Sequence, residues 1–247
     1  MHQVDSMSPQ ERRASVSLAL VFAFRMLGLF MVLPVLATWG QQLQGATPFL
    51  IGMAIGAYGL TQAFLQIPFG MLSDRVGRKP VIVFGLLLFA AGGLVAAGAD
   101  SITQVIAGRV LQGAGAIAAA VMALVADSTR EQHRTKAMAM IGMSIGLAFA
   151  VAMVAGPVVA RMAGLGGVFL STSALALVGI VLVLLAVPTP QQTQPHRDAG
   201  VVRGALWPSL ANGQLLRLNY GIACLHAILM ATFLAIPLAL QQQAGLA

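Results

Sequence analysis

Apolar residues in this chain of 247 residues form long continuous runs, and short polar segments separate the runs. A helix that crosses a bilayer needs about 20 mostly apolar residues, whereas the strands of a membrane barrel alternate in polarity. The pattern therefore predicts membrane-spanning helices. We predict seven of them, at residues 16–38, 49–72, 81–97, 102–125, 137–160, 167–187 and 215–240.

The composition argues against a water-soluble domain. Hydrophobic residues make up 58% of the chain and charged residues only 9%, against about 45–50% and about 25% in soluble proteins. The net charge of +7 does not indicate nucleic-acid binding, because the 14 Lys and Arg residues form no basic stripe and no aromatic stacking motif accompanies them. We expect a lipid bilayer as the partner and no nucleic acid.

The reactive side chains favour no enzyme and no metal site. The single Cys224 cannot form an intramolecular disulfide, and the four His residues are far apart in the sequence. No predicted span pairs a His with an Asp, Glu or Ser at a spacing suited to nucleophilic or metal chemistry. We therefore expect a protein without catalytic residues, metal or cofactor.

Basic residues predict the orientation, because connections rich in Lys and Arg stay in the cytoplasm. Of the Lys and Arg residues outside the spans, all but Arg161 lie in the amino-terminal tail or in the second, fourth and sixth connections. Those four segments hold Arg12, Arg13, Arg75, Arg78, Lys79, Arg130, Arg134, Lys136, Arg197 and Arg203. The amino terminus is therefore predicted to be cytoplasmic. A cleaved signal peptide is disfavoured, because Arg25 interrupts an overlong first run.

The chain divides into three predicted regions. Residues 1–188 form a six-helix amino-terminal bundle, and residues 189–214, rich in Gln and Pro, form a cytoplasmic linker. Residues 215–247 then supply the first helix of an incomplete second bundle. The fold class is an all-α membrane protein.

One connection carries a specific motif, GMLSDRVGRKP at residues 70–80. Topology alone explains its basic residues, but not Asp74 between two glycines at these spacings. The segment resembles the signature of the major facilitator superfamily, G-x-L-x-D-R-x-G-R-R/K. The matching positions are Gly70, Leu72, Asp74, Arg75, Gly77, Arg78 and Lys79.

Two further segments resemble the same family. The fourth span contains Arg109, Gln112, Gly113 and Gly115, similar to R-x-x-Q-G-x-G. The fifth span, from Gly146 to Gly156 and Pro157, resembles the antiporter motif, although Ala152, Ala160 and Arg161 stand where glycines are usual. A proline kink in a glycine-rich packing helix is the alternative interpretation. The first and seventh spans resemble the YajR-type drug-efflux branch.

The resemblance implies a secondary active transporter, in which two six-helix bundles rock about a site near the bilayer midplane. It implies proton-coupled efflux of small hydrophobic or drug-like molecules across the inner (cytoplasmic) membrane, driven by the proton gradient without a cofactor. The alternatives are transport of sugars or other small solutes, and a truncated fragment inactive in transport. The implied partners are substrate, protons, bilayer and the missing second half.

Polar residues inside the spans are candidates for cavity lining or proton coupling, because intramembrane ions are costly. For Arg25 and Arg109, a role in packing and a role in function are equal alternatives. Tyr58, Gln62 and Gln66 share one face of their span, which either lines a cavity or forms interhelical hydrogen bonds. Gly52 and Gly56 lie four residues apart, a pattern that predicts tight packing against a neighbouring helix. The full candidate set is Arg25, Tyr58, Gln62, Gln66, Arg109, Gln112, Asn219 and His226.

We expect a cytoplasmic latch, a charge network of Asp74, Arg78 and Asp127 that holds the helix ends shut. The family resemblance implies Asp74 and Arg78, and Asp127 is the partner inferred from its place at the end of the fourth span. Protonating one carboxylate would weaken the network and couple proton entry to a conformational change. His226 is a second coupling candidate, because imidazole titrates near neutral pH; a packing role is its alternative.

Overall fold

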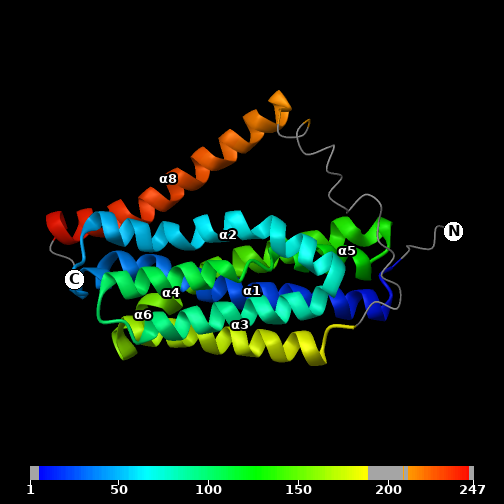
Figure 1. The fold of residues 1–247 in the computed structure, drawn as a ribbon, viewed down its shortest axis with the longest axis horizontal. Helices are drawn as coiled ribbons and strands as arrows, with labels where there is room; N and C mark the ends of the chain where they lie inside the picture. The colour runs from blue at the N-terminus through cyan, green and yellow to red at the C-terminus, as the bar shows by residue number, and fades with distance from the viewer. Residues whose placement is uncertain (1–5, 189–207, 209–210, 245–247) are drawn as a thin grey trace. The chain divides into compact units, whose positions relative to one another are not determined.

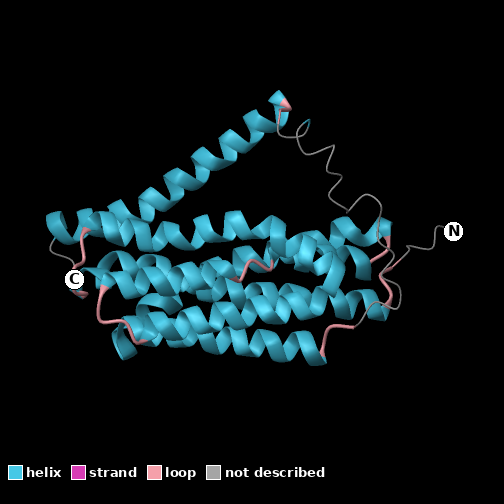
Figure 2. Ribbon diagram, viewed as in Figure 1, coloured by secondary structure: helices cyan, strands magenta, loops and turns pink. Residues whose placement is uncertain are grey.

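The computed structural model describes residues 6–188, 208 and 211–244, and within them the chain is helical with no strand (Figures 1 and 2). The chain divides into two compact units, Met1–Gln194 and Pro195–Ala247. The first unit contains α1 (Pro9–Trp39), η1 (Gly40–Gln42), α2 (Pro48–Val76), α3 (Arg78–Ala97), α4 (Ile102–Ala114), α5 (Ala118–Ser128) and α6 (Glu131–Leu185). The second contains α8 (Gly213–Ala244).

Polar caps set the helix starts, so the helices extend beyond the apolar runs. Ser8 and Glu11 form a capping box that starts α1 at Pro9, seven residues before the predicted span. Thr47 caps α2 through the Leu50 amide, and Ser101 with Gln104 forms a second capping box at the start of α4. The predicted spans 16–38, 49–72 and 81–97 lie inside α1, α2 and α3.

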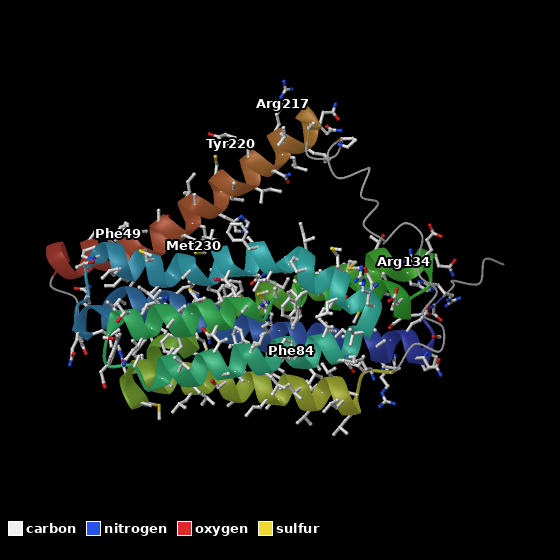
Figure 3. The ribbon with its side chains drawn as sticks, viewed as in Figure 1. Phe49, Phe84, Arg134, Arg217, Tyr220 and Met230 are labelled. Carbon is white, nitrogen blue, oxygen red and sulfur yellow. The ribbon has the colours of Figure 1, made fainter. Side chains whose placement is uncertain are left out.

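The first unit is a bundle in which α1 packs most extensively against α6, α3 against both α4 and α6, and α2 against α4. Its largest buried cluster includes Phe22, Leu86, Ile117, Leu124 and Ile141. Large apolar side chains also face outward, such as Phe49 and Phe84 (Figure 3). Six helices of the described ranges are long and apolar enough to cross a membrane.

The fourth predicted span, 102–125, is not one helix. It breaks after Ala114 and resumes as α5 at Ala118. Gly115, which has φ −74° and ψ 52°, lies against the Gly85 carbonyl of α3, where no Cβ fits. At the break, the Gly115 carbonyl takes no part in the regular backbone hydrogen bonds of a helix, and it accepts a hydrogen bond from Arg25 of α1 (3.0 Å). A close backbone contact and a buried cation thus stabilise the interruption.

The fifth and sixth predicted spans, 137–160 and 167–187, fall in the single element α6. Gly164 interrupts its helical backbone with φ 68° and ψ −173°, a conformation that glycine adopts without steric cost. The predicted connection between the two spans is therefore reduced to a break at one glycine. The seventh predicted span, 215–240, lies within α8.

Basic residues gather at one end of the bundle, which we call the basic end (Arg12, Arg13, Arg75, Arg78, Lys79, Arg130, Arg134 and Lys136). Contacts between distant segments define it: Arg13 Nε donates to Ala186 O (3.0 Å), and Lys79 Nζ donates to Val187 O. In Figure 3, Arg134 lies at this end and Phe49 at the opposite end. Arg197 and Arg203, like most of the predicted linker 189–214, lie outside the described residues.

Candidate functional site

Arg78, the first residue of α3, is the centre of a charge network at the basic end. Its Nε lies 3.2 Å from Asp127 Oδ2 in the last turn of α5, and its Nη1 forms an ion pair with Asp74 Oδ1 in α2. The side chains of Arg78 and Asp127 are only 11% and 9% exposed, and that of Asp74 is 35% exposed. The structure therefore brings together the three residues of the predicted latch, from three helices.

Ser73 is a fourth member of this network, which sequence reasoning missed. Arg78 Nη1 donates to Ser73 Oγ (2.7 Å), and Ser73 Oγ donates to Gly70 O (2.7 Å). The serine is buried, and its two hydrogen bonds connect the guanidinium to the backbone of α2. Its position next to the motif's aspartate, at the end of a helix, is the signal that could have identified it.

The glycines of the motif allow the tight geometry of this connection. Gly77 joins α2 directly to α3 with φ 106° and ψ 151°, a backbone conformation that strains any other residue. A Cβ on Gly70 would lie 3.3 Å from Ala119 Cβ, so α2 and α5 approach closely there. Of the other two predicted members, Arg75 is exposed, and Lys79 Nζ donates to Val187 O, just past the carboxyl end of α6.

Arg25 of α1 is fully buried within the bundle. Its Nη2 donates to Gly115 O (3.0 Å) and to Gln62 Oε1 of α2 (3.2 Å). The guanidinium carbon lies 5.8 Å from the ring centroid of Tyr58 and 5.6 Å from that of Phe89. A cation near the carboxyl end of α4 is favourable, because that end carries partial negative charge. Arg25 therefore stabilises the helix break and joins α1, α2 and α4.

Arg109 of α4 is also buried and bonds across helices. Its Nε donates to Ala54 O of α2 (3.2 Å), and its Nη1 donates to Gln112 Oε1 (3.0 Å). Gln112 Nε2 in turn donates to Thr172 Oγ1 of α6 (3.1 Å), and the Arg109 guanidinium lies 4.7 Å from the Tyr58 ring centroid. Thr172 was not identified from the sequence.

Five of the eight cavity candidates thus form one buried cluster, made of Arg25, Tyr58, Gln62, Arg109 and Gln112. All the hydrogen bonds described for it are internal to the bundle, and Arg25 Nε and Nη1 are buried without a hydrogen-bond partner. Tyr58 Oη and Gln66 Oε1 are buried without a hydrogen-bond partner. The remaining two candidates belong to α8, where Asn219 and His226 are exposed and His226 Nδ1 lies 2.9 Å from Ile222 O.

The glycines of the predicted antiporter motif and of the predicted packing pair behave unequally. A Cβ on Gly156 would lie 2.6 Å from Met31 O, so α6 approaches the backbone of α1 there, one residue before Pro157. Gly146, the other end of the predicted antiporter motif, is exposed and faces open space. The prediction for Gly56 is wrong, because a Cβ added there meets nothing within 4 Å: the residue points away from the neighbouring helices of its unit.

Comparison with known proteins supplies the family. The family model described as Major Facilitator Superfamily matches residues 18–247. The chain is 58% identical to the inner membrane transport protein YajR of Escherichia coli (strain K12), covering 94% of this chain and 51% of that protein. It is 28% identical to the tetracycline resistance protein, class B, of Escherichia coli, covering 75% of this chain and 46% of that protein.

A solved structure shares the arrangement of helices. The crystal structure of a bacterial homologue of the human lysosomal transporter Spinster, inward-facing and unoccupied, has a TM-score of 0.76 at 16% identity. The match covers 98% of this chain and 58% of that chain. The chain spans about half the length of the curated relatives that it matches.

Proposed function

Because the chain belongs to the Major Facilitator Superfamily, we propose that it forms the first bundle of a secondary active transporter in the inner membrane. The transporter exports small hydrophobic or drug-like molecules in exchange for protons. The observation that carries this proposal is the Arg78 network, which joins the ends of α2, α3 and α5 at the basic end. The names of two relatives, an inner membrane transport protein and a tetracycline resistance protein, support the location and the efflux direction.

In this proposal the basic end faces the cytoplasm, because positively charged connections are retained there. A single cysteine replacing exposed Val76, in a Cys224→Ser background, tests the orientation. A membrane-impermeant thiol reagent should label it in inverted vesicles and not in intact cells. Labelling in intact cells would place the basic end outside and contradict the proposal.

The Arg78 network acts as the latch. Arg78 pairs with two carboxylates at once, so protonation of Asp74 or Asp127 removes one of its two ionic partners. A switch between two conformations responds to such a loss, provided that the two states differ by only a few kcal/mol. The proton that enters from one side thereby weakens the contact that keeps the helix ends together.

Proteoliposomes with an imposed pH gradient test the direction of transport. They should contain the chain alone and, in a second preparation, the chain with a co-expressed second bundle. Export requires a hydrophobic dye to move against the direction of proton flow in the second preparation. Movement of the dye with the protons would contradict antiport and favour uptake, and movement of a sugar in place of the dye would favour the sugar alternative.

Replacing Asp74 with Asn tests the latch. The amide keeps the size of the carboxylate but removes its charge, so proton-driven export should fall at least about tenfold, equivalent to about 1.4 kcal/mol. Asp100→Asn is the matched control, because Asp100 is exposed and lies next to Ser101, whose backbone pairs with Gln44 away from the basic end. Unchanged export by a folded Asp74→Asn protein would exclude the latch.

Replacing His226 with Gln tests the second coupling candidate. Imidazole can bind and release a proton and an amide cannot, so the variant should lose part of the pH dependence of export. His196→Gln, in the predicted linker, is the control and should keep the parental profile. A parental pH profile in His226→Gln would leave His226 with a packing role.

A further inference from the structure

A single carboxylate at the basic end caps the first turns of two helices. Glu11, in the first turn of α1, accepts the Ser8 backbone N–H at Oε2 (2.7 Å). At Oε1 it accepts the backbone N–H of Arg130 (2.8 Å), the residue that precedes α6 and has no capping side chain of its own. Negative charge is favourable near helix N-termini. Glu11 therefore links the beginnings of α1 and α6, which are far apart in the sequence.

The side chain of Arg130 completes this contact. Its Nε donates to Glu11 Oε1 (3.0 Å) and its Nη2 to Glu11 Oε2 (3.1 Å), which is a bidentate, charge-assisted pair. Nη2 also donates to Ser6 O (3.2 Å). Glu11 is buried, with only 6% of its surface exposed, although it lies in a polar stretch of the sequence. We call the pair Glu11 and Arg130 the clasp.

The clasp is attached to the latch by a very short segment. Asp127 of the latch precedes Arg130 by three residues, so the distance between their Cα atoms is at most about 11 Å. The segment between them is fixed, because Thr129 is buried and its Oγ1 donates to Val125 O (2.7 Å). The turn between α5 and α6 is therefore anchored at both sides, to Arg78 of α3 through Asp127 and to α1 through Arg130.

We propose that Glu11 is a positioning residue for the latch. By holding Arg130, it keeps the α5–α6 turn where Asp127 meets Arg78, and it ties opening of the latch to movement of α1. This inference rests on the proposed function, since it presumes that the Arg78 network opens and closes. It predicts that breaking the clasp displaces the turn even though every residue of the latch is intact.

Glu11→Gln is a selective test. Glutamine at this position still accepts a bond from the Ser8 amide, so the capping box of α1 is preserved, while the charge that holds Arg130 is removed. Spin labels at Val76→Cys and Thr135→Cys, both exposed, report the distance between the end of α2 and the start of α6 in a Cys224→Ser background. Pulsed electron paramagnetic resonance then gives the distribution of that distance in the full chain.

Asp127→Asn should replace the parental distance by a displaced one, and Glu11→Gln should produce the same displaced distance. Glu11→Asp, which restores a shorter carboxylate, should return part of the population to the parental distance. Arg12→Gln, which removes an exposed neighbouring charge, should leave the distribution unchanged. Thermal unfolding of Glu11→Gln in detergent should still be a cooperative transition, so that the displacement reflects the turn and not a loss of the fold.

The outcomes separate the two proposals. A displacement in Asp127→Asn but not in Glu11→Gln would overturn the role of Glu11 and leave the latch standing. A parental distance in Asp127→Asn would exclude the latch itself. Displacement in Arg12→Gln as well would show that any loss of charge at this end moves the turn, which would also overturn the specific role of Glu11.

Discussion

A Gly92→Ala variant is expected to lose most of its folded protein. A Cβ on Gly92 of α3 would lie 2.5 Å from both Gln112 N and Gly108 O of α4. The contact is mutual, because a Cβ on Gly108 would lie 2.7 Å from Gly92 O. Backbone atoms on both sides cannot rotate away, so the two helices must separate. Overpacking costs about 1–3 kcal/mol where side chains can adjust, and we expect a loss at or above the upper figure here.

Gly56→Ala is the matched control, since it adds the same methyl group to a helical glycine that faces open space. Alanine stabilises a helix by about 0.5–1 kcal/mol relative to glycine, so this variant should be as stable as the parent or slightly more so. Size-exclusion chromatography in detergent gives the folded fraction, and thermal unfolding gives the stability. Equal recovery of the two variants would mean that α3 and α4 are not in backbone contact at Gly92.

The family and the all-helical fold of the bundle were predictable from the sequence and are confirmed. Membrane spans can be located because about 20 apolar residues in a row are required by the thickness of the bilayer, whatever the neighbouring helices do. The helix ends were less predictable. Ser8 and Glu11 are polar and fall outside the apolar run, yet their capping box adds residues to α1.

The break between α4 and α5 could not be predicted from the sequence. Gly115 in an apolar run indicates close packing as readily as a break. Its actual backbone depends on Gly85 of α3 and on Arg25 of α1, and the Arg25 contact spans 90 residues of sequence. The error at Gly56 has the same origin, because a glycine in a spanning helix does not reveal whether a neighbouring helix lies beside it.

The candidate site was predictable where a motif, a helix end or a polar residue inside a span marked its members. Asp74 and Arg78 belong to a recognisable signature, and Asp127 followed from its place at a helix end. Glu11 and Arg130 are 119 residues apart, and Gln112 and Thr172 are 60 apart. No local spacing connects such pairs, because each depends on helices that meet only in the folded bundle.

An Arg78→Gln variant is expected to show the second large effect. Asp127 would keep its buried carboxylate, 9% exposed, without the guanidinium that neutralises it. Removing one partner of a buried ion pair costs about 3–5 kcal/mol, because the remaining charge is left unpaired in a poorly solvated position. Arg78→Lys should fall between parent and Gln, since one ammonium cannot reproduce the fork that reaches Ser73, Asp74 and Asp127 together.

The double variant Arg78→Gln with Asp127→Asn separates stability from switching. It removes the buried Asp127 charge along with its partner and leaves without the guanidinium only Asp74, whose side chain is 35% exposed. The loss of both partners of a polar contact costs less than the loss of one. Thermal unfolding in detergent should therefore recover toward the parent. Proton-driven export should remain low, because a neutral pair at positions 78 and 127 no longer responds to protonation. If export recovered together with stability, the Arg78 network would be a structural contact only, and proton coupling would have to arise elsewhere in the transporter.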